Sequence, residues 1–165
     1  MISDFRRIMY NGELLTFAEF NQEHRRCLDF IKWAVDESES KHKIVLTHHV
    51  PSFQMQCPKF ADNHANGAFI VELKDYIEQS KIDFWVFGHS HYNIDKVIGH
   101  TTCLSNQLGY VFHDEHKTFD HGKYFIIEWS WLLFGLKRKE VYQSSPFVIY
   151  PNCTKLINCT SMALS

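Results

Sequence analysis

Two pairs of histidines stand directly after apolar runs in this sequence. In "VLTHHVPS", residues 45–52, His48 and His49 are adjacent, and in "FWVFGHSHYN", residues 84–93, His89 and His91 are two positions apart. Neutral imidazole is the commonest side-chain metal ligand near neutral pH. Three or more imidazoles in one place form a zinc, iron or manganese type of site, so this pattern predicts metal binding.

The spacing within each pair indicates which rings can share an ion. On extended backbone, side chains two residues apart point the same way, so we expect His89 and His91 to reach the same small volume. Adjacent residues point to opposite faces. One of His48 and His49 is therefore expected to bind metal while the other contacts substrate or supports a ligand. Gly88 can adopt backbone angles closed to other residues and leaves room for close approach.

Apolar periodicity indicates the elements that must position these histidines. Thr16 is a typical N-cap residue, and apolar residues at helical spacing follow it over 17–35. The short apolar run "KIVLTHH" predicts a strand buried on both faces, and "IDFWVFGHSH" predicts a second one. Between them we expect a long loop over 51–67, often functional at this length, and an amphipathic helix over 67–80. Further strands are predicted at 94–99, 100–106 and 123–129.

This order of elements predicts an α/β fold, a sheet with helical cover. The helix over 67–80 is the connection that would make the two buried strands parallel neighbours. Both histidine pairs would then lie at the carboxyl edge of the sheet. In open α/β sheets ligands bind at that edge, because loops from neighbouring strands converge there.

Composition narrows the function classes. The chain has 165 residues and a formal net charge of −2, and its Lys and Arg are scattered, so nucleic acid is not an expected partner. No apolar stretch approaches the ~20 residues of a membrane helix, so no membrane association is expected. The five cysteines form no CxxC pair and their number is odd, which favours a reducing compartment. We therefore expect a cytoplasmic protein.

The remaining histidines fit ordinary polar roles. None of them is paired at the end of a predicted strand, and "HDEH", residues 113–116, is interpreted as the polar tip of a hairpin. They are His24, His42, His64, His100, His113, His116 and His121.

Taken together, "VLTHHVPS" and "WVFGHSHYN" resemble the last two motifs of the calcineurin-like metallophosphoesterases, in the bacterial branch often labelled serine/threonine phosphatases. The intervening "NGAFIVELKDYIEQSKIDFWVFGHSH" is similar to the helix and strand before that family's GHxH motif. "LSNQLGY" resembles the Asn-Pro-x-Gly-Tyr strand that follows, with Gln107 where proline is usual. The resemblance runs from about Asp4 to Asp120 and concerns only the C-terminal half of the family's domain.

This resemblance implies a fold and a chemistry. The fold is the C-terminal half of a metallophosphoesterase sandwich, a buried mixed sheet flanked by helices. In the complete domain two divalent metal ions (Mn, Fe or Zn) lie ~3.5–4 Å apart and clamp a phosphoester substrate, while a bridging hydroxide attacks phosphorus. Carried over to this sequence, His48 and His89 would bind one ion and His91 the other, and His49 would contact substrate or support a ligand.

Before its first histidine pair the sequence lacks the family's three earlier motifs, Asp-x-His, Gly-Asp-x-x-Asp and Gly-Asn-His-Glu. The resemblance implies that these motifs supply the remaining ligands and the general-acid histidine, so no catalytic residue is assignable. Three imidazoles without a bridging carboxylate are expected to hold at most one ion, because nothing offsets the repulsion of two close cations. We expect a phosphoesterase fragment that is inactive alone, from a truncated or split gene.

Two alternatives stay open. In the first, the chain is a non-catalytic module that pairs with a separately encoded N-terminal half, since the two apolar strands would otherwise expose an unpaired edge. The other alternative is a single-metal binding protein. We assign residues 1–128 to the metallophosphoesterase part and expect the tail, residues 129–165, to be poorly ordered.

Overall fold

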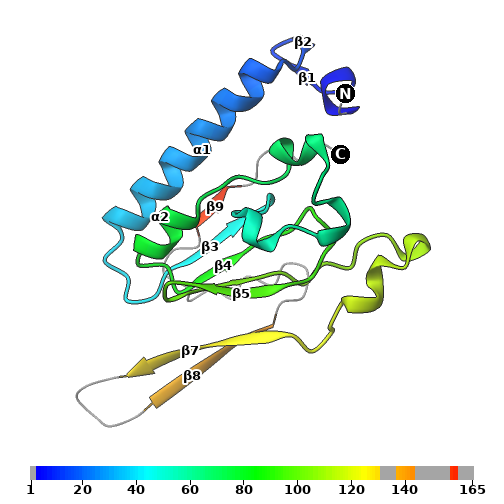
Figure 1. The fold of residues 1–165 in the computed structure, drawn as a ribbon. Helices are drawn as coiled ribbons and strands as arrows, with labels where there is room; N and C mark the ends of the chain where they lie inside the picture. Colours follow the sequence, from blue (N-terminus) through cyan, green and yellow to red (C-terminus); the bar gives the residue numbers. More distant parts are fainter. Residues whose placement is uncertain (1–2, 131–136, 144–156, 160–165) are drawn as a thin grey trace.

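The computed structural model describes residues 3–130, 137–143 and 157–159 of the chain. Its centre is a five-stranded mixed sheet with the order β5-β6-β4-β3-β9 (Figure 1). Neighbouring strands from β6 to β9 in that order are parallel, and β5 is antiparallel to β6. The expected α/β class with a mixed sheet is therefore confirmed. The strands are β3 (Ile44–Thr47), β4 (Phe84–Val86), β5 (Asp95–Ile98), β6 (Thr101–Leu104) and β9 (Ile157–Cys159).

β3 and β4 are the parallel neighbours that the sequence predicted, with Ile44 opposite Phe84. The sequence also predicted an unpaired edge beside these strands. This prediction is wrong for β3, because β9 pairs with its other side and places Ile157 opposite Val45. β9 belongs to the tail. The structure does not describe residues 131–136, 144–156 and 160–165. Most of the tail that we expected to be poorly ordered therefore lies outside the described residues.

α1 (Phe17–Glu37) begins where the sequence predicted. Its first turn is closed by a capping box: the Glu19 amide donates to Thr16 Oγ1 at 3.3 Å, and the Thr16 amide donates to the Glu19 carboxylate at 2.9 Å. These bonds satisfy amides that the start of a helix leaves unpaired. The buried residues of α1, Ile31 and Val35, pack into the core. Ahead of α1 lie a 3₁₀ turn (Ser3–Arg6) and the two-stranded hairpin of β1 (Met9–Tyr10) and β2 (Glu13–Leu14).

The second helix is much shorter than predicted. α2 covers Lys74–Gln79, whereas the sequence pattern predicted a helix over 67–80. The segment before α2 bonds instead to the chain after β3: the Val50 amide donates to Phe69 O at 3.1 Å, and the Val71 amide donates to Val50 O at 3.0 Å. These bonds use backbone groups that a longer helix would need. The predicted apolar face nevertheless points inward, since Ile77 is buried and Phe69, Leu73 and Tyr76 pack against the core.

The predicted loop over 51–67 contains three short 3₁₀ turns. These turns are Phe53–Met55, Pro58–Phe60 and His64–Ala68. The base of the loop is buried, because Ser52 and Met55 have no exposed surface. Ser52 Oγ accepts from the Gln54 amide at 3.2 Å and so caps the first turn. The loop therefore leaves β3 along a fixed path.

The core is formed by the sheet, α1 and α2 around Trp85 of β4, the largest fully buried side chain. The indole nitrogen of Trp85 donates to Thr47 Oγ1 on β3 at 2.9 Å, so the polar atom of this ring is paired. Other fully buried residues of the core are Val45, Val50, Met55, Ile77, Ile82 and Cys103.

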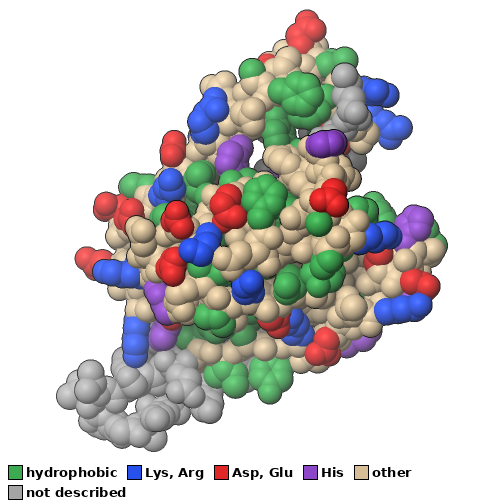
Figure 2. All heavy atoms as spheres, in the orientation of Figure 1, with side chains coloured by type: hydrophobic (Ala, Val, Ile, Leu, Met, Phe, Trp, Pro, Cys, Tyr) green, Lys and Arg blue, Asp and Glu red, His purple; other side chains and the backbone are tan. Residues whose placement is uncertain are grey.

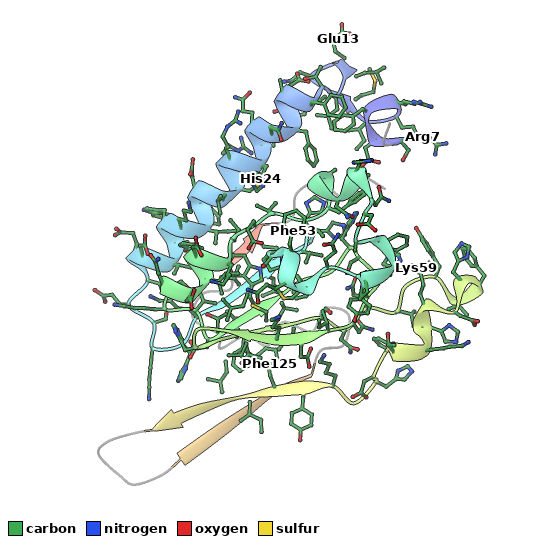
Figure 3. The ribbon with its side chains drawn as sticks, in the orientation of Figure 1. Arg7, Glu13, His24, Phe53, Lys59 and Phe125 are labelled. Atoms are coloured by element: carbon green, nitrogen blue, oxygen red, sulfur yellow. The ribbon has the colours of Figure 1, made fainter. Side chains whose placement is uncertain are left out.

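β7 (Tyr124–Ser130) and β8 (Lys137–Gln143) form a separate antiparallel ribbon. Figure 1 shows this ribbon on the opposite side of the sheet from α1. Phe125 points from β7 toward the sheet (Figure 3) and stacks on Phe84 of β4, with ring centroids 4.4 Å apart. Ile127 of the same strand is buried. The ribbon therefore covers part of the face that α1 leaves open.

Charged side chains of both signs are interspersed on the face shown in Figure 2, without a large patch of one sign. This distribution agrees with the scattered Lys and Arg of the sequence. Within the described part of the chain, no helix is both long and apolar enough to cross a membrane.

Candidate metal centre

Both histidine pairs follow the parallel strands β3 and β4 and lie at the same edge of the sheet. The Gly88 amide donates to His48 O at 3.1 Å, so the two loops are bonded to each other. A Cβ atom on Gly88 would lie 3.5 Å from His48 O, an ordinary contact, and Gly88 has no positive φ. The predicted convergence of the two loops is confirmed, and Gly88 does not use the special backbone angles that the sequence allowed it.

Three of the four histidines form one cluster. His48, His49 and His89 each offer a ring nitrogen, and these nitrogens lie within 4.8 Å of one another. His89 Nδ1 is 2.8 Å from His48 Nε2, a hydrogen bond between two imidazoles. The ring centroids in the cluster are 4.7 to 5.3 Å apart. Among the described residues, this is the one group of three or more metal-ligating side chains that lie so close together.

His49 belongs to this cluster, although the sequence predicted that its ring would point away from His48. That prediction assumed that the strand continues through both residues. β3 instead ends at Thr47, and Thr47 Oγ1 donates to His49 O at 2.9 Å, which closes a bend. Outside a strand, adjacent side chains need not point to opposite faces. Both rings therefore reach the same place.

His91 lies outside the cluster and is held by other groups. Its Nδ1 is 2.8 Å from Glu115 Oε2, its amide donates to Gln107 Oε1 at 2.8 Å, and its ring meets Tyr110 edge-on at 4.8 Å between centroids. The expected extended backbone is wrong, because His89 and His91 have φ of 70° and 49°. A left-handed backbone is uncommon for such residues, and strain of this kind concentrates at functional sites. Metal binding by His91 stays a prediction.

Burial and mutual repulsion keep the cluster uncharged near neutral pH. Burial, followed by the neighbouring histidines, lowers the pKa of His49 to about 4. Burial, followed by His48 and His91, lowers the pKa of His89 to about 4 as well. The pKa of His48 is also lowered, first by burial and then by His91. Neutral imidazoles have the lone pair that a metal ion needs.

Aromatic rings flank two of the three imidazoles. Phe69 stacks on His89 with centroids 4.7 Å apart, and Phe20 of α1 lies 6.3 Å from His49. His49 and His89 are half-buried, whereas His48 is exposed. A ligand would therefore reach the cluster from the side of His48.

The donor set fits one transition-metal ion. Zinc–nitrogen bonds of ~2.0–2.1 Å separate the nitrogens of a tetrahedral site by roughly 3.3 Å, and the three imidazoles offer nitrogens within 4.8 Å of one another. Three neutral nitrogens also suit iron or manganese. Among the described residues no carboxylate belongs to the cluster, so the charge of a second ion would have no offset there.

Sequence reasoning missed two residues that hold His91. Glu115 lies within "HDEH", which was interpreted as a hairpin tip, and forms the start of a 3₁₀ turn (Glu115–Thr118) that follows another (Val111–His113). Gln107 was noted only as a replacement for proline. These residues are 24 and 16 positions from His91, and no spacing pattern connects side chains across such distances.

Comparisons with known proteins identify a viral relative. No protein-family model and no solved structure matches the chain. The chain is 29% identical over 103 residues to uncharacterized protein L509 of Acanthamoeba polyphaga mimivirus. This similarity covers 58% of the chain and 36% of the relative, so the chain spans little more than a third of the relative's length.

Proposed function

We propose that this chain carries the histidine half of the metal site of a phosphoric ester hydrolase. The observation that supports the proposal is the cluster of His48, His49 and His89 at the ends of two parallel strands. This cluster unites the THHxP and GHxH motifs, which resemble those of the calcineurin-like metallophosphoesterases. The finer fold assignment, the C-terminal half of that family's sandwich, is part of the same proposal.

In this proposal His48 and His89 hold a divalent ion, and His49 completes the ligand set or contacts the phosphoester. A bound divalent ion polarises a phosphoryl oxygen and lowers the pKa of bound water. The chain's own part is to present neutral imidazoles and to shield the His89 ring from water with Phe69. His91 serves a second ion in the complete domain.

The isolated chain is expected to hydrolyse little. The cluster contains no carboxylate among the described residues that would bridge two ions. The resemblance assigns the remaining ligands and the general acid to three motifs. None of these motifs precedes His48 in the sequence. In this proposal, hydrolysis of a phosphoester needs ligand and general-acid groups that the described residues of the cluster do not supply.

Metal binding by the isolated chain tests the proposal. We expect one equivalent of Zn²⁺ or Co²⁺ per chain by titration calorimetry, and we expect His89→Ala to weaken binding at least about tenfold because a ligand is lost. His100→Ala is the matched control, since His100 lies in the exposed turn between β5 and β6 and should bind metal as the wild type does. A wild-type chain that binds no metal would contradict the proposal.

Hydrolysis of p-nitrophenyl phosphate in the presence of Mn²⁺ tests the half-site argument separately. Turnover at background level is expected for the isolated chain. Robust turnover that His89→Ala abolishes would mean that these 165 residues contain a complete site.

A single-metal binding protein is the second candidate, because three imidazoles without a carboxylate are also the ligand set of a mononuclear site. The coding DNA upstream of Met1 separates the two. A segment that encodes Asp-x-His and Gly-Asn-His-Glu motifs favours the hydrolase, and an unrelated gene favours the mononuclear protein. A non-catalytic module is less well supported, since β9 occupies the side of β3 at which a partner strand would pair.

A further inference from the structure

The loop after β6 holds His91 through Gln107 and Glu115, and Gly109 of the same loop leaves room for Glu115. We propose that Glu115 is a positioning residue for His91. It fixes the ring in the tautomer with the proton on Nδ1, so that Nε2 keeps the lone pair that a metal ion would take. The inference rests on the proposed function, because it treats His91 as a ligand, and it adds the carboxylate that orients this ligand.

The Glu115 carboxylate is itself anchored. Its Oε2 accepts from the Tyr110 amide at 2.6 Å and lies 2.8 Å from His91 Nδ1. A glutamate side chain is ordinarily ionised at neutral pH. An anionic carboxylate can accept a hydrogen bond but cannot donate one. The proton between these two groups must therefore sit on His91 Nδ1.

The backbone of the histidine loop is held from the same segment. Gln107 Oε1 accepts from the His91 amide at 2.8 Å, and Gln107 Nε2 donates to Ser90 Oγ and Tyr92 O, both at 3.2 Å. Gln107 is fixed in turn by Asn93, whose Oδ1 accepts from the Gln107 amide at 2.6 Å. These bonds stabilise His91 in a left-handed conformation that would otherwise be unfavourable.

Gly109 leaves the space that Glu115 occupies. Its φ is +62°, and a Cβ atom there would lie 2.6 Å from Glu115 Cβ and 3.2 Å from His91 Cβ. A side chain at position 109 would therefore push Glu115 away from the imidazole. The contact between Glu115 and His91 therefore depends on glycine at position 109.

A purely stabilising role accounts poorly for this arrangement. The side chains of His91 and Glu115 are each 30% exposed, and ion pairs with this much solvent access contribute little to stability. A carboxylate anchored by a backbone amide and bonded to one ring nitrogen instead matches the arrangement that orients metal-ligating histidines and raises their basicity.

Nitrogen NMR of the metal-free protein tests the tautomer directly. With ¹⁵N-labelled histidine at pH 8, and the His91 signal assigned by its loss in His91→Gln, we expect a protonated Nδ1 and an unprotonated Nε2. In Glu115→Gln the new amide can donate to Nδ1, so we expect His91 to shift toward the tautomer with the proton on Nε2.

Asp114→Asn is the matched control. Asp114 is the adjacent carboxylate and pairs with Lys117, so the His91 signal should not change. A His91 tautomer that is the same in wild type and Glu115→Gln would overturn the inference.

Metal titration shows whether the effect of Glu115 is confined to His91. The one ion expected in the isolated chain is held by His48, His49 and His89, so Glu115→Gln should bind Co²⁺ as the wild type does. Gly109→Ala should move the His91 tautomer in the same direction as Glu115→Gln, by the separate route of displacing Glu115. A wild-type tautomer in Gly109→Ala, or a loss of Co²⁺ affinity in Glu115→Gln as large as in His89→Ala, would overturn the inference. A wild-type chain without metal binding would contradict the proposed function, while the NMR result would still decide the role of Glu115.

Discussion

His49 and His89 remain uncharged in a pH range where a solvated histidine takes up a proton. Burial disfavours the imidazolium form of each, and neighbouring imidazoles add repulsion, so both have a pKa of about 4. An unfolded chain has no such environment, and its histidines titrate near ~6.5. Between these two values the unfolded state binds more protons than the folded state. The free energy of unfolding must therefore rise with pH from about 4 to about 6.5.

The metal-free protein should accordingly lose stability on acidification. Between pH 7 and pH 5 we expect each of the two histidines to account for roughly 1–2 kcal/mol of lost stability, a value reduced for their partial exposure. His49→Gln should flatten the pH dependence because glutamine does not titrate. Urea unfolding at pH 5, 6 and 7 with a chelator measures this. His100→Gln, in the exposed turn between β5 and β6, should keep the wild-type slope, and an equal slope in His49→Gln would contradict the pKa values.

At the scale of elements, the turn of the β5–β6 hairpin lies tightly against α2. Ile98 pairs with Thr101, so the turn has two residues, and its first residue, Gly99, has a φ of +59°. A Cβ atom on Gly99 would lie 2.9 Å from Glu78 O in α2. The turn therefore needs glycine for two reasons, its backbone angle and its distance from the helix.

Comparing two glycines separates these reasons. Gly12, in the turn between β1 and β2, also has a positive φ of +89°, but a Cβ atom there would meet nothing within 4 Å. Gly12→Ala should cost only the backbone strain, about 1–2 kcal/mol. Gly99→Ala should cost about 1–3 kcal/mol more, because the methyl group also overlaps α2. Urea midpoints of the two variants measure the difference, and equal losses would rule out the contact between the turn and the helix.

The elements also show what local sequence can and cannot predict. α1 was predicted well, because its start depends on Thr16 and Glu19, which are three residues apart. α2 was predicted too long, because residues 69–71 bond to Val50, a contact that no local pattern indicates. The hairpin of β1 and β2 was missed although its Asn11-Gly12 turn is a strong signal.

The site, too, could be predicted from the sequence only in part. The meeting of the two histidine loops could be predicted, since it depends only on two strands being parallel neighbours. The ligand geometry could not, because β3 ends before His48 and the backbone at His89 and His91 is left-handed. The bend after β3 is closed by the local bond from Thr47 to His49 O, whereas the backbone at His91 is held by a segment distant in sequence, through Gln107.

At the scale of the whole molecule, the core and the histidine cluster are connected through Thr47. Its Oγ1 accepts from the indole nitrogen of the fully buried Trp85 at 2.9 Å and donates to His49 O at 2.9 Å. The hydroxyl thus joins the centre of the core to the bend that brings His49 into the cluster. The position of this ring depends on packing that extends across β3 and β4.

Removing that hydroxyl should therefore affect stability and metal binding together. Thr47→Val keeps the shape of the side chain but leaves the Trp85 indole nitrogen without its partner in a buried site, which costs about 1–3 kcal/mol. It also frees His49 O, so we expect metal affinity to fall with stability. Thr47→Ser retains the hydroxyl and should bind metal nearly as the wild type does, although it loses a methyl group. Urea unfolding and Co²⁺ titration of both variants measure the two effects. If Thr47→Val lost stability but bound metal as tightly as Thr47→Ser, the bend at His49 would be held by the two histidine loops alone, through the bond from the Gly88 amide to His48 O.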